Sequence, residues 1–440
     1  MAPNPLIVKS VEQLDYRVTV GDVASAAGLE INLAQQGLLA LASDAGGHLQ
    51  VAEDGEIVYL FPQNFRTILR NKYWRLRLKE WWEKVWKVLF YLIRISFGII
   101  LIVSILIMLV AISILIIAIS SSRSDNNSGG GSSDRGGDTF FFPFLWSPDI
   151  FWLFNPSYDY DRYQQRERYV SSSSQKENQM NFLEAIFSFL FGDGNPNYDL
   201  EERRWGEIGG VIRSNGGAIV AEQIAPYLDK IEPVSMEDED YILPVLARFN
   251  GYPEVSPAGE IIYYFPELQV TATQRDHRSL SSYLQEYRWY FSQAGSGQIL
   301  LAIGLGGANL ILALVLGNLL QGDIAAQIGG LVAFVNSIYL LLLGYGIAFL
   351  GIPLIRYFWV QWKNDRIETR NQKRLDRASL LERPDDVLTG KINYARQFAQ
   401  KKVIGSEDIT YSTEQDLLEQ DIERSDKIDR EWQERLESGS

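Results

Sequence analysis

The sequence predicts an α+β membrane protein with two winged-helix-like modules, about three transmembrane helices and a charged helical C-terminal region. The first observation behind this prediction is a near-repeat, because GEIVYLFP at 55–62 returns as GEIIYYFP at 259–266. The second is a set of long apolar runs without charged residues, which lie between and after the two octapeptides. The third is the density of charged residues from 361 to 440.

Composition excludes several classes of function. The chain of 440 residues has a formal net charge of −14, whereas nucleic-acid binding needs a basic surface. It contains no cysteine and only two histidines, His48 and His277, so we expect no disulfide, no thiolate nucleophile and no Cys- or His-rich metal site. The sequence also lacks a glycine-rich nucleotide-binding motif. We therefore expect no enzyme activity, no cofactor and no bound metal.

The two octapeptides belong to a longer repeat. At a constant offset, residues 46–62 align with 250–266, and each copy reads as strand, turn and strand. Helical patterns precede each hairpin, at 19–29 and 30–47 in the first copy and at 216–228 and 237–251 in the second. Helix, turn, helix and a two-stranded wing form the pattern of a winged-helix module. We therefore assign such modules to 1–64 and 200–275.

The second helix of each module is acidic where a DNA-reading helix carries Lys and Arg. Glu30 and Asp44 lie at its ends in the first copy, EDED at 237–240 opens it in the second, and Arg248 is the basic residue near its end. Phosphate repels such a helix, so the pattern favours protein binding over nucleic-acid binding. The alternative is that the two copies pack against each other as a structural platform.

Residues 65–94 predict a basic, aromatic helix next to the membrane. Tryptophan and long basic side chains prefer the headgroup level of a bilayer, and clustered basic residues attract anionic lipids. The expected membrane-surface residues are Arg70, Lys72, Trp74, Arg75, Arg77, Trp81, Trp82 and Trp86. The position of this stretch against an apolar run favours lipid over nucleic acid as its ligand.

Three uncharged runs are long enough to cross a bilayer, at 95–120, 299–320 and 328–355. The last two are joined by a short connection and predict a helical hairpin. Small and amide side chains let helices approach closely and bond to each other in lipid. The residues expected to do so are Gly304, Gly306, Gly307, Asn309, Gly329, Gly330 and Asn336. The alternative is that the asparagines line a substrate pathway.

Flanking Lys and Arg residues predict the membrane side of each region, and these predictions are inconsistent with three crossings. Basic residues before 95 and after 361 place both flanks on the cytoplasmic or stromal side, and the 299–355 hairpin then places 121–297 on that side too. Three crossings cannot put all three regions on one side. Either the first run is not a simple span, or one flank breaks the rule.

The region 121–199 is interpreted as a linker that contains three kinds of segment. Residues 121–139 are flexible by composition, and 140–156 are aromatic but interrupted by proline. Residues 181–197 predict an amphipathic helix that lies on the membrane or on a partner domain. Further along, the alternating charges of 361–440 predict a solvated or partner-binding helix.

The block FLEAIFSFLFGDGNPN at 182–197 stands between two wing modules and before a glycine-rich hairpin. In this combination the chain resembles a poorly characterised family of membrane proteins from cyanobacteria and chloroplasts. Plant relatives in that family are labelled "iron-sulfur cluster biosynthesis family". The resemblance implies a thylakoid, plasma-membrane or plastid-envelope setting, and it supplies no catalytic residues.

These observations together predict a non-enzymatic, multi-pass membrane adaptor or assembly factor. Its expected partners are a bilayer with anionic lipids and unidentified proteins, while homo-oligomerisation is left open. The first alternative is a transporter or channel component that uses the 299–355 hairpin. The second is a membrane-tethered transcription regulator.

Overall fold

The computed structural model describes residues 3–124, 180–229, 231, 239–273, 280–321, 328–416, 418–420, 422, 425 and 432, with the backbone alone at 75–77, 79, 80 and 122–124. The chain forms two compact units. Unit 1 comprises Met1–Trp82, Pro196–Arg288 and Asp365–Ser440, and unit 2 comprises Glu83–Asn195 and Trp289–Asn364. The flexible segment expected at 121–139, apart from its first four residues, and the aromatic segment expected at 140–156 lie outside the described residues.

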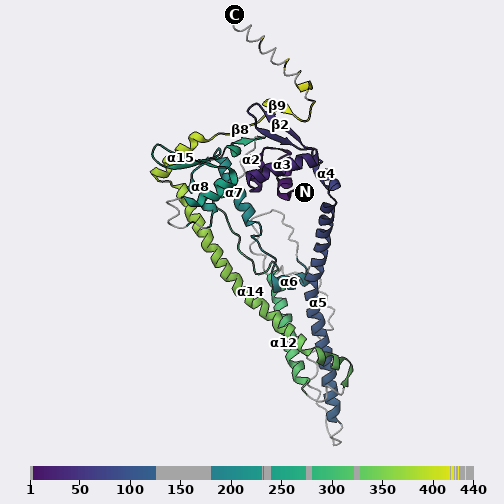
Figure 1. Ribbon diagram of the computed structural model, residues 1–440. Coiled ribbons are helices and arrows are strands. Elements are labelled where there is room, and N and C mark those ends of the chain that lie inside the picture. The colour runs from purple at the N-terminus through teal and green to yellow at the C-terminus, as the bar shows by residue number, and fades with distance from the viewer. Residues whose placement is uncertain are drawn as a thin grey trace, which may run out of the picture. The chain divides into compact units, whose positions relative to one another are not determined.

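The first module of unit 1 packs helices against a small antiparallel sheet (Figure 1). Its elements are α1 (Pro5–Gln13), β1 (Arg17–Val18), α2 (Val20–Ala27), α3 (Ile31–Ala45), β2 (His48–Ala52), β3 (Ile57–Leu60) and α4 (Phe65–Lys72). Thr19 and Asp22 cap the start of α2 reciprocally. Gly28 and Gly46 end α2 and α3 in the left-handed conformation, which glycine adopts without steric cost.

The second module repeats this order of elements, with a longer first helix and shorter later helices. It consists of α7 (Leu200–Ser214), β4 (Ala218–Ile219), α8 (Ala221–Ile224), η2 (Ala225–Tyr227), η3 (Asp240–Ile242), α10 (Leu243–Phe249), β5 (Tyr252–Val255), β6 (Ile261–Tyr264), α11 (Pro266–Gln269) and β7 (Val270–Thr271). Its sheet has the order β4-β6-β5, which corresponds to β1-β3-β2 in the first module. The two repeated octapeptides therefore occupy the same place in two similar sheets.

The two hairpins also share their register. His48 pairs with Leu60 and Tyr252 pairs with Tyr264, and both partners are shifted by the same 204 residues (252 − 48 and 264 − 60). Gly55 and Gly259 close the two turns, each with φ of 86°. That backbone conformation favours glycine. The repeat in the sequence thus reflects one hairpin geometry that is built twice.

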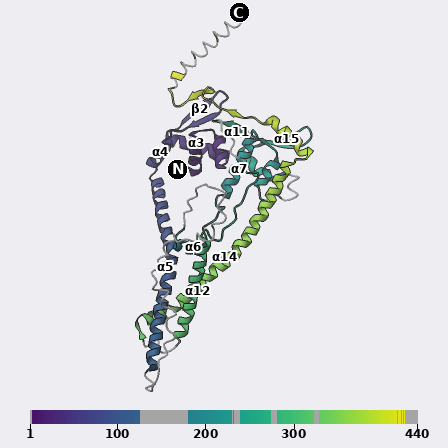
Figure 2. The ribbon, with the colours of Figure 1, turned by 180° about the vertical axis from the view of Figure 1, so that it is seen from behind.

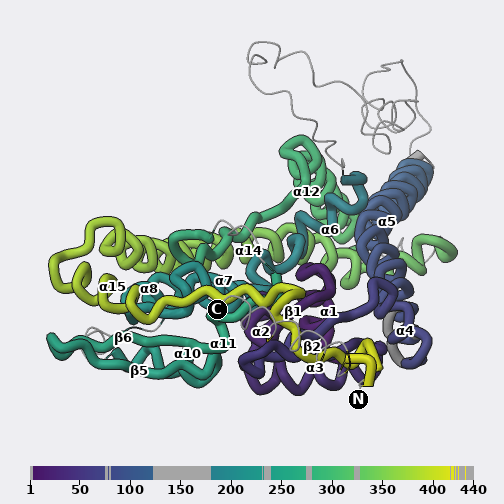
Figure 3. Tube along the Cα trace, turned by 90° about the horizontal axis from the view of Figure 1, so that it is seen from above, coloured from purple at the N-terminus to yellow at the C-terminus, as the bar shows by residue number. Residues whose placement is uncertain are grey.

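The C-terminal segment extends both modules. After α14 (Gly330–Glu382) it forms α15 (Asp386–Phe398), β8 (Lys402–Val403) and β9 (Ile409–Ser412). Figure 2 shows α15 next to the end of α14, and Figure 3 shows the yellow chain continuing from α15 toward β2. β9 pairs antiparallel with β2, and β8 pairs parallel with β7. The region expected to be a charged helix is therefore helical to Phe398 apart from a break at 383–385, and then forms strands, because ITYS carries β-branched and aromatic residues. After β9 the described residues 418–420, 422, 425 and 432 are again helical, as predicted.

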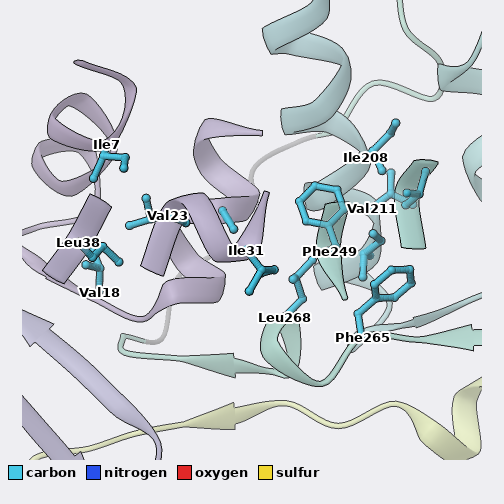
Figure 4. Packing of buried hydrophobic residues seen from close by; sticks show 14 of the residues in the cluster. Ile7, Val18, Val23, Ile31, Leu38, Ile208, Val211, Phe249, Phe265 and Leu268 are labelled. Atoms are coloured by element: carbon cyan, nitrogen blue, oxygen red, sulfur yellow. The ribbon is translucent and has the colours of Figure 1, made fainter. Parts of the chain in front are cut away.

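The two modules share one hydrophobic core. Figure 4 shows Ile7, Val23 and Leu38 of the first module in the same cluster as Ile208 and Phe265 of the second. Helices α2 and α7 pack closely there, since a Cβ on Gly209 would lie 2.8 Å from the Cα of Ser25. The modules expected at 1–64 and 200–275 thus form one body, together with the C-terminal segment.

Unit 2 is a bundle of long apolar helices with one short helix. It contains most of α5 (Trp74–Ser124), together with α6 (Phe182–Phe191), α12 (Ser296–Leu319) and the apolar first half of α14. Three helices are long and apolar enough to cross a membrane, namely Trp81–Ser121, Ser296–Leu319 and Gly330–Glu382. The first contains the run expected at 95–120, and the other two contain nearly all of the runs expected at 299–320 and 328–355.

The helices of unit 2 have definite directions. Leu101 clusters with Ala302 and Phe349 near one end of the bundle. Further along, Leu115 clusters with Leu316 and Val332. α5 and α12 therefore run in the same direction and α14 runs in the opposite one. The chain leaves α5 at one end of the bundle and re-enters at Met180 near the other, where the Arg94 guanidinium donates to the Met180 sulfur at 3.8 Å.

Candidate functional site

The exposed face of α3 is free of positive charge. No Lys or Arg occurs anywhere in Ile31–Ala45, and Asp44 at its end accepts from Lys72 at 2.8 Å and from the Tyr73 hydroxyl at 2.6 Å. Leu33 and Leu39 are 54% and 44% exposed on this helix. This is the second helix of the first module, where the sequence predicted the recognition helix of a winged-helix-like fold. Its exposed surface is apolar and amide-rich and offers no cation to a phosphate backbone.

The equivalent helix of the second module has one cation, and that cation is already engaged. The guanidinium of Arg248 lies 4.0 Å from the centre of the Trp205 ring and donates to the carbonyl oxygen of Gly28 in the first module. Burial lowers the pKa of Arg248, while the charges of Glu30 and Glu201 act in the opposite direction. Arg248 therefore joins the two modules and is not presented to a ligand.

The β2 edge is the outer edge of the first sheet, and β9 occupies it. The Leu49 N–H donates to Thr413 Oγ1 and the Thr413 N–H donates to the Leu49 carbonyl, both at 2.9 Å. Near the turn, the Glu53 N–H donates to the Asp408 carbonyl at 3.2 Å. Two outward-pointing N–H groups of the first hairpin thus hold the C-terminal strand in place.

The β5 edge of the second sheet lacks both of these donors. By the shared offset of 204, Pro253 is the residue equivalent to Leu49 (49 + 204), and Pro257 is equivalent to Glu53 (53 + 204). Proline has no backbone N–H, and it is a common means of closing a sheet edge to pairing. The sequence contained this signal, but it became readable only when the register of the two hairpins was known.

A buried carboxylate joins the first module to the second. Asp22 accepts from Arg213 at 2.6 Å, from the Thr271 hydroxyl at 2.9 Å and from the Ala272 N–H at 3.0 Å. Burial alone raises the pKa of Asp22, but Arg213 and the hydrogen bonds bring it below its usual value. The T-x-x-D spacing at 19–22 is a local signal of a helix cap from which no prediction was made, whereas the contacts with distant partners have no local signal.

Two further ion networks were not predicted. Lys391 of α15 donates to Glu222 at 2.8 Å and to Glu239 at 2.7 Å, and the Tyr263 hydroxyl donates to Glu239. Arg374, 1% exposed, pairs with Glu286 at 2.8 Å. Burial alone raises the pKa of Glu286, but neighbouring arginines hold it below its usual range. The arginines after 361 were interpreted as membrane-flanking charges, and Arg374 instead anchors the end of α14 inside unit 1.

The expected membrane-surface residues do not all share one environment. Trp74, Trp81, Trp82 and Trp86 of α5 are each more than half exposed. Lys72 pairs with Asp44, and Arg70 is exposed on α4, which ends before α5 begins. The side chains of Arg75 and Arg77 lie outside the part of the chain that the structure describes.

The expected helix-packing residues also divide into two groups. Gly306 lies against α14, since a Cβ there would be 2.5 Å from Phe349, and Asn309 is fully buried and donates to Ser104 of α5. A Cβ on Gly304, Gly307, Gly329 or Gly330 would meet no described atom within 4 Å. Gly329 and Gly330 instead have positive φ at the start of α14, and Asn336 is exposed. The small-residue pattern predicted the contact but not which glycines make it.

The block at 182–197 forms a polar centre in unit 2. Asp193 accepts from Arg94 at 2.7 Å, from Ser188 at 2.5 Å and from the Gln293 N–H at 2.9 Å. Gly192 has φ of 80°, and a Cβ there would lie 2.2 Å from a guanidinium nitrogen of Arg356. Arg356 in turn donates to the Ser188 carbonyl at the end of α6. The helix expected to lie on a membrane or a partner domain is thus packed inside the bundle.

The site chemistry does not point to a metal or a cofactor. Within the described ranges, no group of three or more His, Asp or Glu side chains is placed to hold a metal ion. The carboxylates that the structure buries, such as Asp22, Glu239 and Glu286, are paired with Arg or Lys. In this arrangement the carboxylates are engaged in ion pairs that stabilise the fold.

Comparison with known proteins gives one informative match. A chloroplastic protein of Arabidopsis thaliana, described as the uncharacterized protein At5g03900, is 41% identical over 438 residues, and the match covers 97% of this chain and 81% of the relative. That description carries no iron–sulfur label. No family model and no solved structure matches the chain.

Proposed function

Because the chain belongs to the same family as the chloroplastic protein At5g03900 of Arabidopsis thaliana, we propose that it is a non-enzymatic adaptor or assembly factor of a plastid or cyanobacterial membrane. Unit 2 is its membrane anchor. Unit 1 is a head of two duplicated winged-helix-like modules that bind protein. The observation that carries this proposal is the exposed face of α3, which presents two leucines among amide side chains and has no basic residue.

The proposed topology follows from the shared core of unit 1. Its three pieces pack into one body, so we place all three on the same side of the membrane. With α5, α12 and α14 as the three spans, the chain must then return to that side between Ser124 and Met180, which resolves the conflict between the charged flanks and three crossings. The charged flanks favoured that arrangement. The chain has no cysteine, so single cysteines at the exposed positions Gln63, Glu202 and Gln397 should react with an impermeant maleimide from one side. A cysteine at Ser121 should react from the other side, and labelling of all four from one side would contradict the three spans.

The interior of unit 2 supports anchoring over transport. Among the described residues of this unit, the fully buried polar side chains are Ser104, Ser188 and Asn309. The rest of the contact between α5, α12 and α14 is apolar, with Met108, Ala111 and Leu316 at its centre. A hydrated pathway needs a continuous polar lining, which this packing does not provide.

The direct test is cross-linking and affinity purification of the full chain from its native membrane. We expect a protein partner at a near-constant ratio to the chain. The double variant Leu33→Glu/Leu39→Glu should recover less of it, while Val387→Glu, on an equally exposed position of α15, should recover the normal amount. If neither the natural chain nor Val387→Glu recovered a protein partner, the adaptor function would be contradicted.

The transcription-regulator alternative has a separate test. The full chain in neutral-lipid nanodiscs is titrated with random duplex DNA at several salt concentrations. We expect binding weaker than the non-specific range of about 10⁻⁴–10⁻⁶ M at physiological salt, because neither α3 nor α10 presents a free cation. Micromolar binding with a steep salt dependence would favour the regulator.

A further inference from the structure

The strand on the β2 edge is held mainly by pairing along its backbone, and none of its side chains is fully buried. All four residues of β9 are half-buried, and the pairing with β2 is irregular between Val51 and Ala52. Ile409 is the residue of β9 that packs onto the buried cluster around Val58. Main-chain hydrogen bonds therefore supply much of the binding, and such bonds accept any extended segment of suitable sequence.

Like charges surround this strand. The turn of the first hairpin carries Glu53, Asp54 and Glu56, all exposed. The residues that flank β9 are also acidic, namely Glu407, Asp408, Glu414 and Asp416. The Glu53 N–H donates to the Asp408 carbonyl, so these two acidic residues are neighbours across the strand pair. Like charges on neighbouring strands destabilise their pairing.

Little positive charge compensates this surface. Lys402 pairs with Asp54, and both side chains are well exposed. The Arg17 guanidinium donates to the carbonyl oxygens of Ala272, Ile404 and Gly405, and its charge also interacts with Glu407 and Asp408. Burial raises the pKa of Glu56, and the charges of Asp54 and Glu267 raise it further, while Lys402 acts in the opposite direction. The resident strand is thus electrostatically mismatched with the edge that it covers.

We propose that the β2 edge is a docking site for an extended, basic segment of a protein partner, which replaces β9. The Leu49 and Glu53 N–H groups hold the main chain of the incoming segment, and its Lys or Arg side chains face Glu53, Asp54 and Glu56. The β5 edge has prolines at both donor positions and takes no such strand. This inference rests on the protein-binding function proposed above and names one surface and one partner chemistry for it.

A cross-strand disulfide tests the exchange in the full chain. Gln50 and Ser412 are opposite each other, and their neighbours Leu49 and Thr413 form the hydrogen-bonded pair, so the positions suit a disulfide between strands. The chain has no other cysteine. In Gln50→Cys/Ser412→Cys, oxidation fixes β9 on β2 and reduction releases it, which makes the reduced protein the matched control.

The probe is a labelled peptide with the sequence of residues 407–414 in which Glu407, Asp408 and Glu414 are replaced by lysine. Binding is measured by fluorescence anisotropy in neutral-lipid nanodiscs, which avoids attraction of the peptide to anionic lipid. We expect binding to the reduced form, loss of binding on oxidation, and weakening by added salt. The peptide of natural sequence should bind about tenfold more weakly, as a few lost surface charge pairs predict.

Three results would overturn the proposal. The first is equal peptide binding to the oxidised and reduced forms, and the second is equal affinity for the lysine and natural peptides. The third is failure of the disulfide to form, because β9 would then not lie on β2. The oxidised chain could lose the peptide but keep its native-membrane partner, or the peptide could fail to bind the reduced chain while that partner is still recovered. In either case the adaptor function stands and its docking surface lies elsewhere.

Discussion

The two sheets of unit 1 have the same strand order and register, yet the C-terminal segment completes them differently. On the first sheet it adds β9 to the edge of β2. On the second it places α15 against the sheet, where Leu388 and Ala395 pack onto Val220 and Ile262. Two prolines account for the difference, since Pro253 and Pro257 remove the N–H groups that Leu49 and Glu53 donate. The two copies of one hairpin thus differ in what covers them, because proline replaces two backbone N–H donors in the second copy.

The comparison extends to the helix caps behind the sheets. Asp22 occupies the third position of α2, and Gln223 occupies the third position of α8. Asp22 is charged, buried and shared among partners from both modules. Gln223 is neutral, and its side chain accepts from the Val220 N–H at 3.0 Å. The first module therefore depends on one ionic contact where the second depends on a local cap.

The largest expected effect comes from removing this ionic contact. Asp22→Ala leaves the Arg213 charge without its carboxylate and should cost about 3–5 kcal/mol, as for other broken buried pairs. Gln223→Ala removes a cap interaction and should cost about 1 kcal/mol. Hydrogen exchange of unit 1 in the full chain, in nanodiscs, measures both as free energies of opening. Equal effects would show that the two caps are equivalent after all.

The same carboxylate predicts the acid response. The pKa of Asp22 is lower in the folded than in the unfolded chain, where it is about 3.9. Its contribution to stability is therefore complete above the unfolded pKa and is lost as the pH falls toward the folded pKa. Asp22→Ala should show a shallower loss of unit 1 stability between about pH 5 and pH 2 than the natural chain. An unchanged slope would contradict the assignment.

The second effect concerns the second sheet, which α15 covers. Lys391, with a side chain 13% exposed, lies between Glu222 and Glu239, so Lys391→Met leaves Glu239 buried without a cation. We expect a loss of about 2–3 kcal/mol, below the full range for a buried pair because Glu222 is partly exposed. Lys401→Met, on an exposed neighbour, is the control. A similar loss in both variants would point to a general effect of charge.

Lys391 also predicts an alkaline response of the opposite sign. Burial lowers its pKa, but Glu222 and Glu239 raise it above the usual value. A raised pKa stabilises the fold below the unfolded pKa, and this stability is lost as the pH rises through the folded pKa. Hydrogen exchange is too fast at such pH, so circular dichroism melts above about pH 10.4 are the measurement. Lys391→Met should be less sensitive there than the natural chain.

The third effect concerns the two donor positions themselves. Leu49→Pro removes the N–H that donates to Thr413 and should lower the free energy of opening of β9 by about 1–3 kcal/mol. Leu49→Ala keeps that N–H and separates the loss of the side chain. Pro253→Leu changes an exposed position and should leave the β5 hairpin nearly unaffected. Protection of the Tyr411 and Thr413 amides is the readout, and unchanged protection in Leu49→Pro would show that β9 does not depend on this bond.

How much the sequence predicts depends on whether the signal is local. The repeat at 55–62 and 259–266 located both hairpins, since a glycine turn and alternating β-branched residues are local signals. The three apolar runs located the long helices by length alone. The glycines were less informative, because Gly304 and Gly306 differ only by their position around α12, and only Gly306 faces Phe349.

The contacts that unify unit 1 had no local signal. Asp22 and Arg213 are far apart in sequence, and so are Lys391 and Glu222. Arg374 follows an apolar run, where a cation is expected for topological reasons, and its burial depends on Glu286 and Asp229. The strand at Ile409–Ser412 was not predicted, because the charged residues around it indicated a helix. Long-range pairing of charges is decided by the fold, so composition and periodicity could not supply it.

The smallest effect is expected at the lysine that the C-terminal segment contributes to the first sheet. Lys402 pairs with Asp54 at the turn of the β2–β3 hairpin, and the two side chains are 46% and 38% exposed. Exposed pairs contribute little to stability, because solvent and salt screen them and ordering two long side chains is unfavourable. Lys402→Gln should therefore leave the opening free energy of β9 unchanged within error, in contrast to Lys391→Met on α15.

The same substitution makes the surface around Glu53, Asp54 and Glu56 more negative. A basic peptide at the β2 edge should therefore bind more tightly to this variant at low salt and equally at high salt. If Lys402→Gln instead loosened β9 as much as Leu49→Pro does, the strand would be held by this charge pair, and the contrast between the donors of one sheet and the prolines of the other would lose its explanatory role.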